Sequence, residues 1–130
     1  WLDGGVMANE LVISTLTIAF AKTGSASVST APAALSLTVS GDAWMDNTQT
    51  IGFAAEEAIL LGDVATGGYW FVQNLDATNY FEIRPGTGAT DMIKIKAGEW
   101  AIFRTSGDAT APFAKADTGN VQVRFLRFEN

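Results

Sequence analysis

Clustered carboxylates are the side chains that could most readily do chemistry in this chain. Two of them, held on either side of a cleft, can act as general acid and base in glycoside hydrolysis, and several around a turn can bind calcium. Their spacing in the sequence defines neither a cleft nor a fixed separation, and residues 42–47 lack the ligand spacing of an EF-hand. We therefore interpret them as solvated loop residues and predict no bound metal or cofactor. The candidates are Asp42 with Asp46, the pair Glu56 and Glu57, and Asp63.

The chain lacks the residues on which most other enzymatic sites depend. It contains no histidine and no cysteine, which removes the commonest general base, the commonest metal ligand and every thiolate site. A serine nucleophile would have no histidine to activate it. The sequence Ala97-Gly98-Glu99 suggests a cupin-like enzyme, but cupin metal sites rely on histidines. The sequence therefore predicts a protein that is not an enzyme.

Exposed aromatic side chains could instead bind a ligand by stacking. Tryptophan and tyrosine combine a rigid apolar face with a polar group, which suits both sugars and protein interfaces. Trp44, Tyr80 and Trp100 are the candidates for a sugar-stacking platform. Core packing is the competing interpretation, because most aromatic residues of a strand-rich domain are buried.

Two segments that are apolar on both faces of a strand indicate a subunit interface. In residues 69–72 the side chains of Trp70 and Val72 share one face and those of Tyr69 and Phe71 share the other. Such a strand is either central and covered on both sides or part of an interface. The second half of the segment 121–128 shows the same pattern, and arginine is favoured at interfaces. We predict an oligomer or partner interface formed by Tyr69, Trp70, Phe71, Arg124, Leu126 and Phe128.

Length and charge limit the partners of the chain. Its 130 residues fit one domain with its own core. The formal net charge of −6 opposes binding to a phosphate backbone, and no apolar run is long enough to cross a bilayer. We therefore predict no nucleic-acid and no membrane partner. Because Met7 resembles a translation start, we expect residues 1–6 to be a tag, linker or N-terminal extension, followed by a single β-sandwich domain over 7–130.

Short strands separated by turn residues are expected along most of the chain. Strand formers flank the turn-favouring segment 74–79, which predicts a β-hairpin over 68–85, and a second hairpin is predicted over 92–104. For residues 54–61 a two-turn helix and a strand with Ile59 and Leu61 inward both remain open. Further strands are expected at 11–20, 35–39, 48–53, 113–116 and 121–128, with 22–34 as a loop or weak edge strand and 42–47 as a loop.

This pattern of about eight short strands with almost no helix indicates an all-β fold. An antiparallel β-sandwich of jelly-roll type is the predicted architecture. A small β-barrel is the alternative.

Several short sequence segments of the C-terminal half resemble segments of a group of small virion proteins of tailed bacteriophages. The likeness runs from about Glu56 to the C-terminus. It implies a non-enzymatic structural protein located in the virion, at the surface of the phage particle. The segments are Leu61-Gly62-Asp63-Val64, residues 68–83, Lys96-Ala97-Gly98-Glu99 and Pro112-Phe113-Ala114-Lys115-Ala116.

Within this group, we expect a capsid decoration or cement protein that stabilises the shell as a symmetric homo-oligomer such as a trimer. Its partners would be copies of itself and the major capsid protein or another virion protein. The strands that are apolar on both faces would form the contacts between subunits of the oligomer. The segment from Met7 to Phe20 or the Ser/Thr-rich loop would bind the capsid. The alternative is a carbohydrate- or receptor-binding jelly-roll module of a tail fibre.

Overall fold

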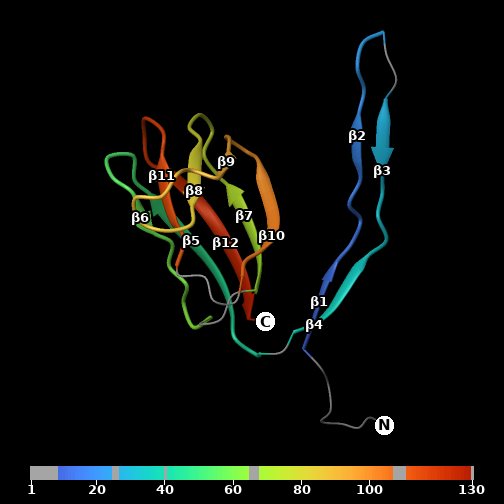
Figure 1. Cartoon of the computed structure of the whole chain (residues 1–130), viewed down its shortest axis with the longest axis horizontal. Coiled ribbons are helices and arrows are strands. Elements are labelled where there is room, and N and C mark those ends of the chain that lie inside the picture. Colours follow the sequence, from blue (N-terminus) through green and yellow to red (C-terminus); the bar gives the residue numbers. More distant parts are fainter. Residues whose placement is uncertain (1–8, 25–26, 40, 65–67, 107–110, 130) are drawn as a thin grey trace. The chain divides into compact units, whose positions relative to one another are not determined.

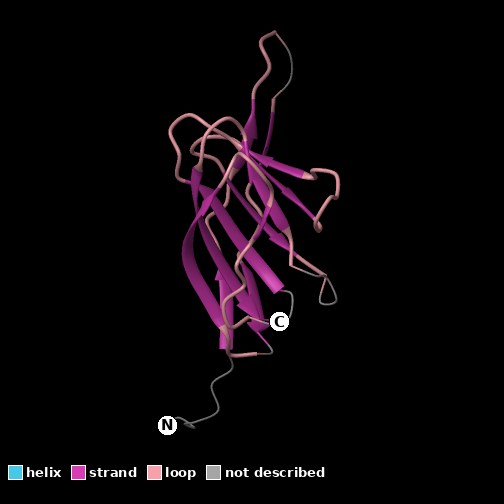
Figure 2. Ribbon diagram, turned by 90° about the vertical axis from the view of Figure 1, so that its left-hand side faces the viewer, coloured by secondary structure: helices cyan, strands magenta, loops and turns pink. Residues whose placement is uncertain are grey.

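A computed structural model describes the chain except for residues 1–8, 25–26, 40, 65–67, 107–110 and 130 (Figures 1 and 2). It divides into two compact units, residues 1–40 and residues 41–130. The prediction of one domain over 7–130 did not anticipate this division. The prediction for residues 1–6 lies outside the described residues. The regular elements of the described residues are all strands.

The first unit is a two-stranded ribbon, which we call the N-terminal ribbon (the described residues of 9–39). β1 (Asn9–Ile13) pairs with β4 (Leu35–Val39), and β2 (Ile18–Phe20) pairs with β3 (Val28–Thr30), in both cases antiparallel. The strand predicted at 35–39 is confirmed, and β3 lies in the segment predicted to be a loop or weak edge strand.

The single strand predicted over 11–20 is wrong, because β1 and β2 are separate elements. Thr15 lies between them with a φ of 62°, in the left-handed region that a β-branched residue rarely adopts.

The described residues of the second unit form eight strands in two four-stranded sheets. The first sheet has the order β10-β7-β12-β5 and the second has the order β6-β11-β8-β9, with antiparallel pairing throughout. The strands are β5 (Trp44–Ile51), β6 (Glu57–Ala58), β7 (Gly68–Asn74), β8 (Phe81–Arg84), β9 (Ile93–Ile95), β10 (Trp100–Arg104), β11 (Phe113–Ala116) and β12 (Val121–Glu129).

The pairing in the second unit is nested. β5 pairs with β12, β6 with β11, β7 with β10 and β8 with β9, so that the first strand meets the last and the middle two meet each other. This is the arrangement of a jelly roll, in which one long antiparallel ribbon folds over into two packed sheets. The predicted antiparallel β-sandwich is therefore confirmed, although the described residues form twelve strands where about eight were predicted. The barrel alternative does not hold for the described sheets, because the edge strands β10 and β5 do not pair.

Both predicted hairpins are wrong, because their two strands lie in different sheets. β7 belongs to the first sheet and β8 to the second, so residues 75–80 cross between sheets instead of reversing within one. β9 and β10 are separated in the same way. The actual hairpin of this region is β8–β9, in which Ile83 is opposite Ile93.

Two local predictions in the segment 42–61 also change. β5 begins at Trp44, inside the predicted loop, because residues 44–51 pair along their whole length with β12. No helix forms among residues 54–61, where β6 is a short strand. Ile59 is 2% exposed and Leu61 packs against the core, as the strand alternative predicted.

The core fills the space between the two sheets, and Trp70 lies near its centre. Its ring stacks on Phe103 at a centroid distance of 6.1 Å and meets Phe125 edge-on at 6.2 Å. The Trp70 Nε1–H donates to Thr105 Oγ1 over 3.1 Å. Arg127 also lies inside the sandwich, where its guanidinium is 4.7 Å from the Trp70 ring centre and donates to the Val64 carbonyl over 2.8 Å. Burial lowers the pKa of Arg127.

Candidate functional site

The outer face of the first sheet is the candidate functional site. Side chains of successive strand residues alternate between the core and the outside. Exposure alternates along β7 from Gly68 to Asn74 and along β12 from Val121 to Phe128. The buried residues of each strand point into the core, and the residues between them point outward. Apart from the exposed Gln122, the outward residues of these central strands are only partly exposed. We call this surface the outer aromatic face.

The register of the four strands arranges the outer aromatic face in three rows. One row runs Trp100, Gln73, Arg124 and Thr48; the next runs Ile102, Phe71, Leu126 and Asp46; the third runs Arg104, Tyr69, Phe128 and Trp44. Seven of these twelve positions are aromatic or aliphatic. Because directly opposed side chains of antiparallel strands are in contact range, the apolar side chains of the middle and third rows adjoin one another and form a patch, which Trp100 of the first row extends.

Contacts on this surface hold its aromatic rings in place. The rings of Phe71 and Trp100 have centroids 6.0 Å apart and are tilted by 35°. The Arg104 guanidinium lies 4.5 Å from the centre of the Tyr69 ring, within the range of a cation–π interaction. The aromatic surface is therefore preorganised, which lowers the entropy lost when a partner binds.

One ion pair borders the apolar rows. Arg124 donates to both carboxylate oxygens of Asp46, from Nε over 3.0 Å and from Nη2 over 2.9 Å. These hydrogen bonds, followed by the charge of Arg124, hold the pKa of Asp46 below its usual range. Because the two charges are paired, an apolar surface that covers them would not leave an isolated charge buried.

Five of the six residues predicted to form an interface lie together on the outer aromatic face. They are Tyr69, Phe71, Arg124, Leu126 and Phe128. Trp70 is the exception, because it points into the core and is 1% exposed. Ile102 was missed by sequence reasoning, although its alternation with Ala101 and Phe103 placed it on the same side as Trp100.

The three predicted sugar-stacking residues do not form one platform. Trp44 and Trp100 are 66% and 50% exposed, and both lie on the outer aromatic face. They occupy the two edge strands in the first and third rows, so about 14 Å of sheet width separates them at the usual strand spacing. Tyr80 precedes β8 of the second sheet, and Lys94 Nζ lies 4.2 Å from the centre of its ring. One sugar ring could not contact all three.

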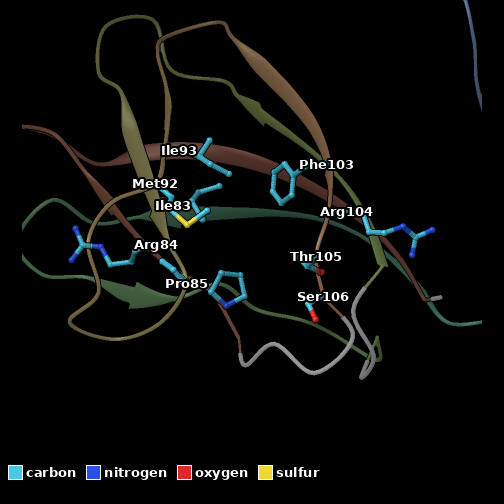
Figure 3. Close-up of a pocket in the computed structure, with 10 residues that line it drawn as sticks. Ile83, Arg84, Pro85, Met92, Ile93, Phe103, Arg104, Thr105 and Ser106 are labelled. Carbon is cyan, nitrogen blue, oxygen red and sulfur yellow. The ribbon is translucent and has the colours of Figure 1, made fainter.

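A hollow of about 410 Å³ opens between the second sheet and β10 (Figure 3). Ile83, Met92 and Ile93 line one side and Phe103 the other, while Arg84 and Arg104 point away from the space in opposite directions (Figure 3). Its described lining contains no carboxylate. The hollow is therefore an apolar groove without an acid–base pair.

Glu56 and Glu57, like Asp46, make structural contacts. Glu56 accepts hydrogen bonds from Thr87 Oγ1 at 2.5 Å, from the Gly88 amide and from Arg84 Nη1 at 2.7 Å, and these bonds lower its pKa in that order of importance. Glu57 accepts a hydrogen bond from the Gly52 amide over 2.9 Å. Among the described residues no three acidic side chains are grouped so that they could hold a metal ion. Nor does any described helix have the length and apolarity to span a membrane.

Comparison with known proteins adds no relationship to this geometry. The chain has no matching protein-family model, no significant match among curated proteins and none among solved structures.

Proposed function

We propose that the chain is a non-enzymatic structural protein of a tailed-bacteriophage particle, and specifically a capsid decoration or cement protein that self-associates at the particle surface. The outer aromatic face is the observation that carries this proposal. Aromatic residues and arginine are enriched in protein interfaces, and unpaired charges are depleted from their centres. The phage assignment itself rests on the sequence resemblance of the C-terminal half.

The middle row of the face explains why a second copy would bind there. Ile102, Phe71 and Leu126 lie side by side on neighbouring strands, and Asp46 at the end of the row is neutralised by Arg124. A second copy of the chain placed against this row would bury apolar surface without burying an unpaired charge. As a cement protein, the chain would stabilise a shell through the area buried across the joints between its subunits.

A charge placed in the middle row tests the proposal. We expect Leu126→Glu to shift the purified protein from an oligomer to a monomer in sedimentation velocity, since burying that carboxylate without a partner is unfavourable. Gln122→Glu is the matched control, because it adds the same charge to the same face of β12 at an exposed position outside the rows. Circular dichroism confirms that both variants are folded.

The particle assignment needs its own measurement. We expect the unmodified chain to co-sediment with expanded, DNA-free shells of the phage that encodes it, and Leu126→Glu to co-sediment less. A chain that stays monomeric at high concentration and does not bind these shells would refute the proposal.

Exposed tryptophan favours a second candidate function, a carbohydrate- or receptor-binding module of a tail fibre. Trp100 is half-exposed and lies beside Phe71, and Gln73 and Arg124 continue its row with hydrogen-bonding groups. An aromatic ring next to polar side chains is suited to a sugar. In a glycan array this function predicts hits that are lost in Trp100→Ala and kept in Trp44→Ala. An array without hits would exclude it for the glycans present.

A further inference from the structure

In each half of the N-terminal ribbon the apolar side chains lie mainly on one side. In β1 and β4 the pairs Leu11–Leu37 and Ile13–Leu35 lie on one side, opposite Val12 and Ser36. In β2 and β3 the pair Phe20–Val28 lies on one side and the pair Ala19–Ser29 on the other. The apolar side chains of β2 and β3 are substantially exposed, with values of 57% for Ile18, 59% for Phe20 and 65% for Val28, whereas Leu11, Ile13 and Leu37 are half-buried.

A ribbon of this kind is not stable in water by itself. A two-stranded hairpin is marginal, and a third strand or a packed apolar face is needed for stability. Proteins usually protect exposed edges with lysine, proline or bulges. The four paired strands of the ribbon contain neither lysine nor proline, so their edges are not protected by these residues. These features indicate that the ribbon is completed by a binding partner.

Charge indicates which partner this is. Glu10 and Lys22 are the only charged residues between positions 9 and 39, whereas the whole chain has a net charge of −6. A basic or an acidic surface would find almost no complementary charge on the ribbon, and an anionic membrane would repel the chain. Each ribbon, in contrast, has no net charge of its own, because Glu10 and Lys22 balance each other, so two ribbons do not repel each other. A second copy of the same ribbon therefore fits best.

The required interface area agrees with this choice. The outer aromatic face spans four strands and about five residues, which is about 320 Å² at standard strand dimensions. A stable interface needs about 800 Å² from each partner. The ribbon spans residues 9–20 along two strands, about 40 Å by 10 Å, and so offers about 400 Å² more. Neither surface reaches this area by itself, so a stable oligomer of this chain needs a contact beyond the outer aromatic face.

We propose that the apolar faces of N-terminal ribbons from different copies of this chain pack against one another and form a second interface of the oligomer. This inference rests on the proposed self-association. It assigns to this segment a contact between copies of the chain, whereas the sequence led us to expect that the segment binds the capsid. The left-handed Thr15 fits this role: the apolar side chains have odd numbers in β1 and even numbers in β2, and an irregularity at this point allows both sets to face the same partner.

Single cysteines test the proposal cleanly, because the chain has none of its own. Val28→Cys places a thiol on the apolar face, and Ser29→Cys places one on the opposite face of the same strand. Each full-length variant is treated with a short bismaleimide and analysed on a denaturing gel. We expect most of the Val28→Cys protein to be linked into dimers and the Ser29→Cys protein to remain a single chain. The pair Phe20→Cys and Ala19→Cys repeats the test on the neighbouring strand.

Leu126→Cys, on the outer aromatic face, separates this inference from the proposed function. Cross-linking at residue 126 without cross-linking at 28 and 20 would overturn the ribbon contact and leave the sheet contact intact. Cross-linking at 28 and 20 but not at 126 would support the ribbon contact and refute the sheet contact. Equal cross-linking at 28 and 29 would also overturn the ribbon proposal, since it shows no preference for the apolar face. Absence of cross-linking at all positions refutes both.

Discussion

Asn74 provides the sharpest test of how this fold is held together. Its side chain is 1% exposed at the end of β7. The Nδ2 group donates to the Asn79 carbonyl over 2.9 Å and to the Ile95 carbonyl over 3.1 Å, and Oδ1 accepts from the Asp76 amide over 2.8 Å. One side chain thus connects the first sheet to the crossing segment 75–80 and to β9 of the second sheet.

We expect Asn74→Ala to lower the free energy of unfolding by about 3 kcal/mol, because three hydrogen bonds are lost at a net value of about 1 kcal/mol each. For a chain of this size that corresponds to a fall in Tm of about 10–15 °C. Asn74→Asp keeps the shape of the side chain but replaces the donor, so that an oxygen faces the carbonyls of Asn79 and Ile95. We expect it to be at least as destabilising as the alanine variant.

Urea denaturation followed by tryptophan fluorescence measures this effect, since the buried Trp70 becomes exposed on unfolding. Thr78→Ala is the control, because it truncates an exposed side chain in the same crossing segment and should change stability by less than about 0.5 kcal/mol. A loss below about 1 kcal/mol for Asn74→Ala, with an unchanged denaturant slope, would refute the reasoning, because it falls short of the value for three buried hydrogen bonds.

Two further predictions concern single contacts. Thr105→Val removes the acceptor of the buried Trp70 Nε1–H and should cost about 1–3 kcal/mol in the same urea assay, whereas Thr105→Ser keeps the hydroxyl and should restore most of the loss. The pKa of Glu56 is lowered in the folded state by Thr87, Gly88 and Arg84, so its contribution to stability is present above its unfolded pKa of about 4.3 and is lost as the pH falls through the lower folded value. Glu56→Gln should therefore make the decline of Tm below about pH 4 less steep. The decline should not vanish, because Asp46 and Asp76 also have lowered pKa values. An unchanged decline would contradict the contribution of Glu56 to acid sensitivity.

The outer aromatic face was predictable in part, and its residues show why. The alternation of Tyr69 and Phe71 with Trp70 and Val72 is a property of one strand, so the sequence indicated an apolar outer side. The same holds for Leu126 and Phe128 in β12. The neighbours of these residues on β10 and β5 were not predictable, because pairing brings together strands that are distant in sequence. Trp70 was assigned to the interface because alternation alone does not tell which of two apolar faces points inward.

Local patterns in the sequence determined most strand positions and the limits on chemistry. Side-chain alternation is encoded by adjacent residues, and the absence of histidine and cysteine is independent of any fold. Only the tertiary structure decided that β7 and β8 separate into two sheets. The turn-favouring residues 74–79 are compatible with a hairpin and with a crossing. The crossing is selected because it places Trp70 and Phe81 in one core and lets Asn74 bond to Ile95, twenty-one residues away, and neither contact is visible in the local sequence.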